Sequence, residues 1–160
     1  MADPRAVQDC YPDDFAHCYG CGRLNRDGLH VRSFWDGEEA VARFTPRPEH
    51  MAYPGFVYGG LLASLFDCHA MGTASAATER AAGRGICEGS SPRFVTASLK
   101  LDYVKPTPLG PELVLRARPV TVGERKVVVQ GTIAALGVVT VRCEAVAVRM
   151  PAATVSPSGR

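Results

Sequence analysis

One carboxylate stands alone in a long apolar segment of the sequence. Asp67 lies between Phe66 and Cys68, and the segment around it begins at the glycine pair Gly59 and Gly60. Backbone amides at the start of a helix lack intrahelical acceptors, so they readily bind a carbonyl oxygen or an anion. An acid among apolar residues is costly unless it has a use. The glycine amides and Asp67 together predict a site for a carbonyl group or an anion.

The spacing of these residues predicts how they can cooperate. Gly59 and Asp67 lie eight residues apart in the sequence, and a helix separates two such backbone positions by about 12 Å. An amide and a carboxylate that act on one carbonyl must each lie about 3 Å from it. The aspartate side chain cannot close that gap. We therefore expect the two groups to come from different subunits of a dimer.

The segment has two unlike faces when it is drawn as a helix at about 100° per residue. The apolar face, which we expect to pack on a sheet, consists of Leu61, Leu62, Leu65, Phe66 and Cys68. The other face carries small residues and one acid, namely Gly60, Ala63, Ser64, Asp67, Ala70, Met71 and Ala74. Small side chains permit close approach, so we expect a ligand or a second subunit there; an exposed alanine-rich surface is the alternative.

The elements that must position these residues follow from pattern and turn signals. Strands are predicted over residues 29–34 and 40–44, and a helix over 59–82. Four more strands are predicted over 94–103, 112–120, 126–134 and 138–148. Short connections make these strands antiparallel neighbours. The order predicts an α+β domain in which one long helix packs on a single antiparallel sheet.

The bulk properties favour one ordinary globular domain. The chain has 160 residues, 46% of them hydrophobic, and a formal net charge of +2, which is too small to indicate nucleic acid or an anionic membrane as partner. The first residues contain acids and prolines where an export signal has an apolar stretch, so we expect a cytoplasmic protein. We expect a flexible N-terminal arm over 1–14, one domain over 15–150 and a disordered tail over 151–160.

The cysteines are predicted to be free thiols, because no export signal is present. They are Cys10, Cys18, Cys21, Cys68, Cys87 and Cys143. Cys18-x-x-Cys21, with His17 and His30 nearby, suggests zinc, but a structural site needs four ligands and a second CxxC or HxxxH is missing. We expect no metal here and a packed N-terminal lid instead. Cys68 and His69 are expected in the core rather than in catalysis.

Three segments resemble the hotdog-fold acyl-CoA thioesterases related to phenylacetate-pathway and mammalian thioesterase-superfamily members. The first is His17-Cys-Tyr-Gly-Cys-Gly22 with Asn25 and Gly28-Leu29. The second runs from Pro54-Gly-Phe-Val-Tyr-Gly-Gly60 through Asp67 to Met71-Gly72, and the third is Val95 to Tyr103 followed by Lys105-Pro106 and Leu109-Gly110. Their order and spacing span most of residues 17 to 150.

The resemblance implies a curved antiparallel sheet wrapped around the long helix, assembled as a homodimer or a dimer of dimers. It implies hydrolysis of an acyl-CoA or acyl-carrier-protein thioester without a metal or cofactor, coenzyme A entering only as part of the substrate. Asp67 matches the family's catalytic carboxylate, as nucleophile or as general base on water. Gly59 matches the oxyanion-hole amide. Thr96 matches a Ser or Thr that helps to place the attacking water.

Two positions depart from the family pattern. Tyr58 stands where the family has the histidine of its HGG motif, and Ala52 stands where some relatives carry Asn or Gln. His50, Tyr58 itself or a bound water would take over their support of the oxyanion. The remaining residues that we expect at the substrate, including two cations for the phosphates of coenzyme A, are Gly60, Ser64, Met71, Arg93 and Lys105.

Two other functions remain open from the sequence. A non-catalytic acyl-thioester binding protein is permitted by the missing histidine. A hydratase acting on enoyl-CoA needs an Asp and His pair on one short segment, and Asp67 and His69 point about 200° apart on a helix. The hydratase is therefore the weaker alternative.

Overall fold

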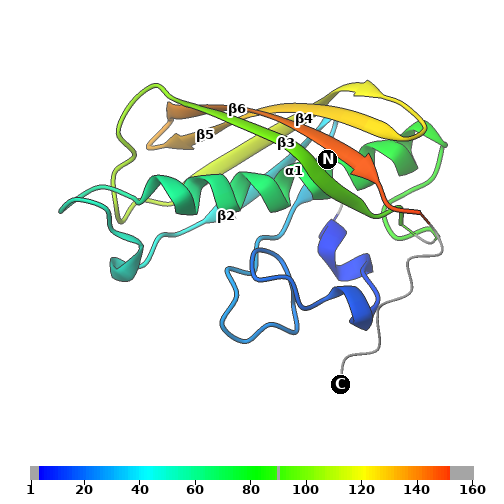
Figure 1. The fold of residues 1–160 in the computed structure, drawn as a ribbon, viewed down its shortest axis with the longest axis horizontal. Coiled ribbons are helices and arrows are strands. Elements are labelled where there is room, and N and C mark those ends of the chain that lie inside the picture. The colour runs from blue at the N-terminus through cyan, green and yellow to red at the C-terminus, as the bar shows by residue number, and fades with distance from the viewer. Residues whose placement is uncertain (1–3, 90, 152–160) are drawn as a thin grey trace.

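One long helix packs against one face of a six-stranded antiparallel sheet in the computed structural model (Figure 1), which describes residues 4–89 and 91–151. The helix is α1 (Gly59–Ala81). The strands are β1 (Phe34–Asp36), β2 (Glu39–Phe44), β3 (Phe94–Tyr103), β4 (Leu113–Val122), β5 (Lys126–Ala135) and β6 (Val138–Arg149), in the spatial order β1-β2-β4-β5-β6-β3. This confirms the predicted α+β architecture. None of the described helices is long and apolar enough to cross a membrane.

Helix α1 begins and ends close to where the sequence predicted. Its first residues are Gly59 and Gly60, and Gly83, with φ of +73°, turns the chain away just after its end. Leu62, Leu65 and Phe66 are almost fully buried. The predicted sheet-facing side is confirmed for these residues, whereas the sulfur of Cys68, also assigned to it, lies against the N-terminal loop.

The small-residue face of α1 is open only along part of its length. Ala70 and Ala74 are fully buried in the main core, so the expectation that they face a ligand or a second subunit is wrong. Further along, Ala76 and Ala77 pack in a second apolar cluster against the N-terminal segment. A helix that is covered on all sides needs no polar face. What remains half-exposed is the stripe of Gly60, Ala63, Ser64, Asp67 and Met71.

The strand predicted over residues 29–34 is wrong except at its end. Only Phe34 enters β1. The amides of Leu29 and Val31 donate instead to the carbonyls of Tyr19 and Gly20, at 2.8 and 2.9 Å. This segment is extended because it pairs with the N-terminal loop rather than with the sheet. The other strand predictions hold to within a few residues, and β3 matches its prediction at both ends.

Residues 4–14 do not form the flexible arm predicted for 1–14. In the described part of that range, the short 3-10 helix η1 (Val7–Cys10) lies against α1, with Val7 and Gln8 buried. The Gln8 side chain donates to Ser33 Oγ at 3.1 Å and accepts from the Ser33 amide at 2.8 Å. A second 3-10 helix, η2 (Asp13–Phe15), follows. Of the predicted tail, residues 152–160 lie outside the described residues, as do residues 1–3 of the arm.

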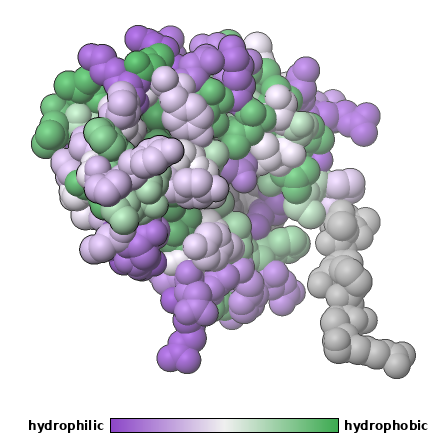
Figure 2. All heavy atoms as spheres, turned by 60° about the vertical axis from the view of Figure 1, so that its left-hand side comes forward, coloured by the Kyte–Doolittle hydropathy of each residue, from purple (hydrophilic) through white to green (hydrophobic). Residues whose placement is uncertain are grey.

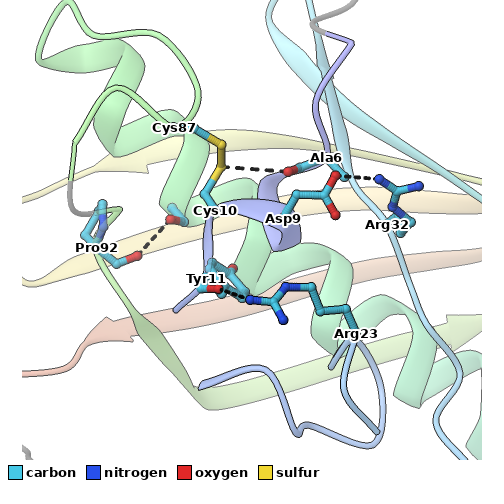
Figure 3. The surroundings of a disulfide bond; sticks show 9 residues. Ala6, Asp9, Cys10, Tyr11, Arg23, Arg32, Cys87 and Pro92 are labelled. Atoms are coloured by element: carbon cyan, nitrogen blue, oxygen red, sulfur yellow. Dashed lines mark hydrogen bonds and ion pairs between the residues drawn. A yellow bond between two sulfur atoms is a disulfide. The ribbon is translucent and has the colours of Figure 1, made fainter. Parts of the chain in front are cut away.

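A disulfide joins Cys10 of η1 to Cys87 in the loop after α1 (Figure 3), with their Cα atoms 5.2 Å apart. The prediction that all six cysteines are free is therefore wrong for this pair. Beside the bond, Arg32 forms an ion pair with Asp9 of η1. Pattern reading missed the bond because its two cysteines lie 77 residues apart and belong to segments with no shared motif.

Replacing both bonded cysteines, as Cys10→Ser with Cys87→Ser, should lower the free energy of unfolding by about 2–4 kcal/mol, because a bond that closes so long a loop restricts the unfolded chain strongly. Urea unfolding of the oxidised wild type and of the double variant measures the difference. Reductant should lower the wild-type midpoint toward that of the variant and leave the variant unchanged. Equal midpoints for the two oxidised proteins would contradict the prediction.

Candidate active site

Asp67 and Thr96, both predicted site residues, meet where α1 crosses the sheet edge. Asp67 lies half-buried on the open stripe of the helix. Thr96 lies on β3, and its hydroxyl donates a hydrogen bond to Asp67 Oδ1. The ladder between β3 and β6 shifts register between Thr96 and Ser98. Such bulges are frequent beside active sites, where they re-aim a side chain. Asp67 is thus a carboxylate held in place by one hydroxyl.

The start of α1 offers unused backbone donors. Tyr58 is the N-cap residue, and its carbonyl accepts from the amides of Leu61 and Leu62 at 3.1 and 3.4 Å. Among the described residues, no acceptor is found for the amides of Gly59 and Gly60. These donors carry the positive end of the helix dipole. The site can therefore bind and polarise a carbonyl oxygen.

A cleft of about 550 Å³ opens beside this helix start. Gly59, Leu62 and Tyr103 line it together with Lys105. Exposed aromatic side chains, among them Tyr53, surround this end of the molecule, and Figure 2, which turns that end toward the viewer, shows apolar surface interspersed with polar surface. The cleft is suited to a ligand with both an apolar and a polar part.

Tyr103 is a residue of this cleft that sequence reasoning missed. Its hydroxyl donates to the Gly59 carbonyl at 2.8 Å, and its ring lies against the Gly59 Cα. Burial raises the pKa of Tyr103, so the phenol stays protonated and remains a donor. The sequence places Tyr103 at the end of the predicted strand that carries Thr96. The alternation pattern of a strand does not show that this end contacts the start of the helix.

Tyr58 and His50, two further predicted site residues, lie next to the start of α1. The Tyr58 ring packs closely over Gly60 and is largely exposed. The His50 carbonyl accepts from the Tyr58 amide at 2.8 Å, and burial, with Arg47 adding to it, lowers the pKa of the His50 imidazole. His50 is therefore neutral at neutral pH.

Two predicted side chains on the stripe have local roles in the structure. Ser64 donates to the Gly60 carbonyl at 2.9 Å. Met71 is half-buried and packs against the main core. Both flank Asp67 on the open stripe, where they would shape the surface next to a substrate.

Arg93 lies away from the cleft. Its guanidinium stacks on the rings of Tyr11 and Phe15, with centroid distances of 3.7 and 4.4 Å. Its neighbour Pro92 accepts from Ser75, and that serine lies sixteen residues along the helix from Gly59, or about 24 Å. Lys105, at the cleft, is the better placed of the two predicted cations for a phosphate near Gly59.

His69 and Cys68 lie inward, as predicted. His69 is fully buried; it accepts from Ser33 Oγ at 2.8 Å and donates to the Ala40 carbonyl at 3.2 Å. Burial lowers its pKa to about 4, so the ring is neutral and serves as a core hydrogen-bonding group.

Within one chain the two halves of the candidate site stay apart. The Gly59 amide and the Asp67 carboxylate belong to the same helix, eight residues or about 12 Å apart. Tyr103 is hydrogen-bonded to Gly59, and Thr96 is hydrogen-bonded to Asp67. One half can polarise a carbonyl and the other can take a proton from water or attack directly. This is the separation predicted from the sequence.

Comparison with known proteins identifies proteins that are similar to this chain in sequence or in fold. A Thioesterase superfamily protein from Shewanella loihica has a crystal structure with a TM-score of 0.67; it is 45% identical and aligns over 88% of this chain and 100% of its own. A thioesterase from Haemophilus influenzae shares the fold at 15% identity and a TM-score of 0.65, over 81% of this chain and 85% of its own.

The PaaI protein of the E. coli phenylacetic acid degradation operon also shares the fold, at 18% identity and a TM-score of 0.61, over 77% of this chain and 81% of its own. A search of curated proteins found no match. The sequence model of the Thioesterase superfamily matches residues 54–141, from the loop before α1 into β6. The hotdog fold and the family resemblance predicted from the sequence are therefore confirmed, and the chain belongs to the Thioesterase superfamily.

Proposed function

We propose that this protein hydrolyses an acyl thioester of coenzyme A or of an acyl carrier protein to the free acid and the thiol. The observation that carries the proposal is the Asp67 carboxylate, half-buried on the helix and held by the Thr96 hydroxyl. Membership of the Thioesterase superfamily supports thioester hydrolysis as the general chemistry. The open amides at the start of α1 supply the second requirement, a place for the carbonyl oxygen.

The residues divide the reaction between them. The Gly59 amide polarises the thioester carbonyl and stabilises the negative charge that develops on its oxygen. Asp67 either removes a proton from the water that attacks the carbonyl carbon, or attacks that carbon itself. In the first route, collapse of the tetrahedral species breaks the carbon–sulfur bond and gives the free acid, and Asp67 passes the proton it took from water to the leaving thiolate. In the second route, collapse leaves the acyl group on Asp67 as a mixed anhydride, and the thiolate takes a proton from water. A water molecule then hydrolyses the anhydride to the free acid and the Asp67 carboxylate. Thr96 fixes the carboxylate so that one oxygen remains free for the reaction.

The site is completed by a second copy of the chain in this proposal. Strand β3 ends the sheet and pairs only with β6 among the described strands. It is ten residues long, and its exposed side chains include Val95 and Tyr103, about half exposed at 48% and 53%. A long edge strand with apolar side chains is a template for pairing with another strand.

A two-fold axis through the middle of β3 would bring Asp67 of one subunit close to Gly59 of the other. Antiparallel pairing of two β3 strands sets the Thr96 end of one opposite the Tyr103 end of the other. Since Thr96 contacts Asp67 and Tyr103 contacts Gly59, the carboxylate of one subunit approaches Gly59 of the partner subunit. Two equivalent sites form in each dimer.

Mixing two inactive variants tests the shared site. In chains carrying Asp67→Asn the acid is missing, and in chains carrying Gly59→Pro the amide is missing. The two variants are mixed in equal amounts, unfolded together, refolded and supplied with a panel of acyl-CoAs. The mixture should recover about a quarter of the wild-type rate of thiol release, because half of the dimers are mixed and each mixed dimer holds one intact site of two.

Each variant refolded alone provides the baseline for this measurement. No recovery in the mixture, although native mass spectrometry shows mixed dimers, would mean that each site uses one chain. A wild type that releases no thiol from any acyl-CoA or acyl-carrier-protein substrate would contradict hydrolysis itself.

A further inference from the structure

Three cysteine sulfurs converge on the side of α1 next to Asp67. Those of Cys18, Cys21 and Cys68 all lie within 4.8 Å of one another. Two belong to the loop after η2, and the third comes from the middle of the helix. None of the three is part of the disulfide. From the sequence, only Cys18 and Cys21 could be recognised as neighbouring ligands. Cys68 lies 47 residues after Cys21, in an apolar helix pattern where a cysteine looks like any core residue.

The loop is shaped to reach the helix cysteine. A Cβ on Gly20 would lie 2.2 Å from Cys68 Sγ, and one on Gly22 would lie 2.4 Å from the Cys18 amide nitrogen. Neither position can hold a side chain. The Gly22 amide donates to the Cys18 carbonyl at 2.7 Å, which closes the turn. The two glycines thus allow a tight turn to seat its sulfurs directly on the helix.

The separation of two of the sulfurs fits a tetrahedral metal. Zinc binds thiolates at about 2.3 Å, so two sulfurs of a tetrahedral site lie about 3.8 Å apart. The Cys18 and Cys68 sulfurs lie 3.7 Å apart. Cys68 is 9% exposed, whereas Cys18 is exposed. A metal held here would be buried on the helix side and reachable from solvent on the loop side.

A positively charged side chain lies near the three sulfurs. The charge of Arg93 acts on Cys18 and Cys21. This guanidinium is held between two aromatic rings, and its buried Nη1 has no hydrogen-bond partner among the described residues. Three thiolates and a divalent cation sum to one negative charge, which Arg93 would balance.

We propose that Cys18, Cys21 and Cys68 bind one zinc ion, with a water molecule as the fourth ligand on the exposed side of Cys18. Thiolate ligands select zinc over magnesium or calcium. No fourth His, Cys, Asp or Glu of the described residues joins the cluster, so solvent supplies the last position. The ion ties the N-terminal loop to α1 at the residue that follows Asp67. The proposal is independent of whether the protein hydrolyses thioesters.

Zinc content of full-length protein tests the proposal. Protein produced with added Zn²⁺, purified under reducing conditions without chelator and analysed by mass spectrometry of the metal, should contain about one zinc per chain. Cys18→Ser changes an exposed ligand, so the fold should survive, and Cys68→Ala removes the helix ligand. Each should lower zinc affinity by more than the roughly 10–100-fold that loss of a mere supporting partner costs. Cys143→Ala, a buried cysteine outside the cluster, should keep its zinc.

Cobalt gives a second readout. Co²⁺ in place of zinc should produce a thiolate-to-cobalt charge-transfer band and the intense visible bands of a tetrahedral site in the wild type and in Cys143→Ala, but not in Cys18→Ser. Two results would overturn the proposal. One is wild-type protein that holds no more zinc than Cys18→Ser. The other is a disulfide among these three cysteines in freshly isolated protein, seen by alkylation and intact mass.

Discussion

Asp67→Asn should reduce the rate of thioester hydrolysis by at least about a hundredfold, the effect of removing a general acid–base group, while the fold stays intact. The amide of asparagine has the size of the carboxylate but can neither take a proton from water nor attack a carbonyl. The residue is half-buried, and the Thr96 hydroxyl donates to its carboxylate. That hydroxyl can still donate to the asparagine oxygen, so little stability should be lost.

Thiol release from acyl-CoAs that are short, long and aromatic measures this effect, with Asp102→Asn as the control. Asp102 is an exposed carboxylate on the same edge strand, where it pairs with Lys100, and its replacement should leave the rate within a fewfold of wild type. Equal rates for wild type and Asp67→Asn would remove Asp67 from catalysis. Thioester binding without turnover in the wild type would instead identify a non-catalytic binding protein.

Gly59→Pro should lower the same rate by about 10²–10³, the cost of losing one oxyanion donor. Proline has no backbone N–H, and its fixed φ suits the first position of a helix. The preceding Tyr58 has φ −61° and ψ 127°, the extended conformation that a residue before proline requires. The substitution therefore removes the donor without breaking the helix.

Gly59→Ala is the matched control, because alanine keeps the N–H. A Cβ at this position would meet the Tyr103 ring at 3.4 Å, which is ordinary contact, so the rate should stay close to wild type. Far-UV circular dichroism of both variants checks that α1 is retained. If Gly59→Pro hydrolyses thioesters as fast as Gly59→Ala, the oxyanion is stabilised elsewhere, and the Tyr103 hydroxyl becomes the next donor to test.

Sequence reasoning was strongest where local chemistry decides the structure. The glycines at 59, 60 and 83 bracket α1 because they favour helix ends, and alternation fixed β3 at both of its ends. The Asp67 and Thr96 contact was available only through the family resemblance, since a helix residue and a strand residue 29 positions apart share no local pattern.

The incorrect predictions all concern which segment of the chain packs on a given surface. Leu29 and Val31 look like strand residues, yet their partners are loop carbonyls. Ala70 and Ala74 look like an open face, yet they are enclosed in the core. Cys10 and Cys87 look like unrelated thiols until the N-terminal segment folds back over the helix. Periodicity shows which side of an element is apolar, but it does not identify the segment that packs on that side.

The position of β3 has a consequence for how the chain is made. This strand leaves the ribosome well before β6, its only neighbour among the described strands, which begins at Val138. Since chains are made at about 5–20 residues per second, the strand that carries Thr96 is without its sheet neighbour for seconds. The last of the described strands is thus the one that holds β3 in the sheet, so a chain cut before Val138 would leave Thr96 without a sheet neighbour to hold it against Asp67.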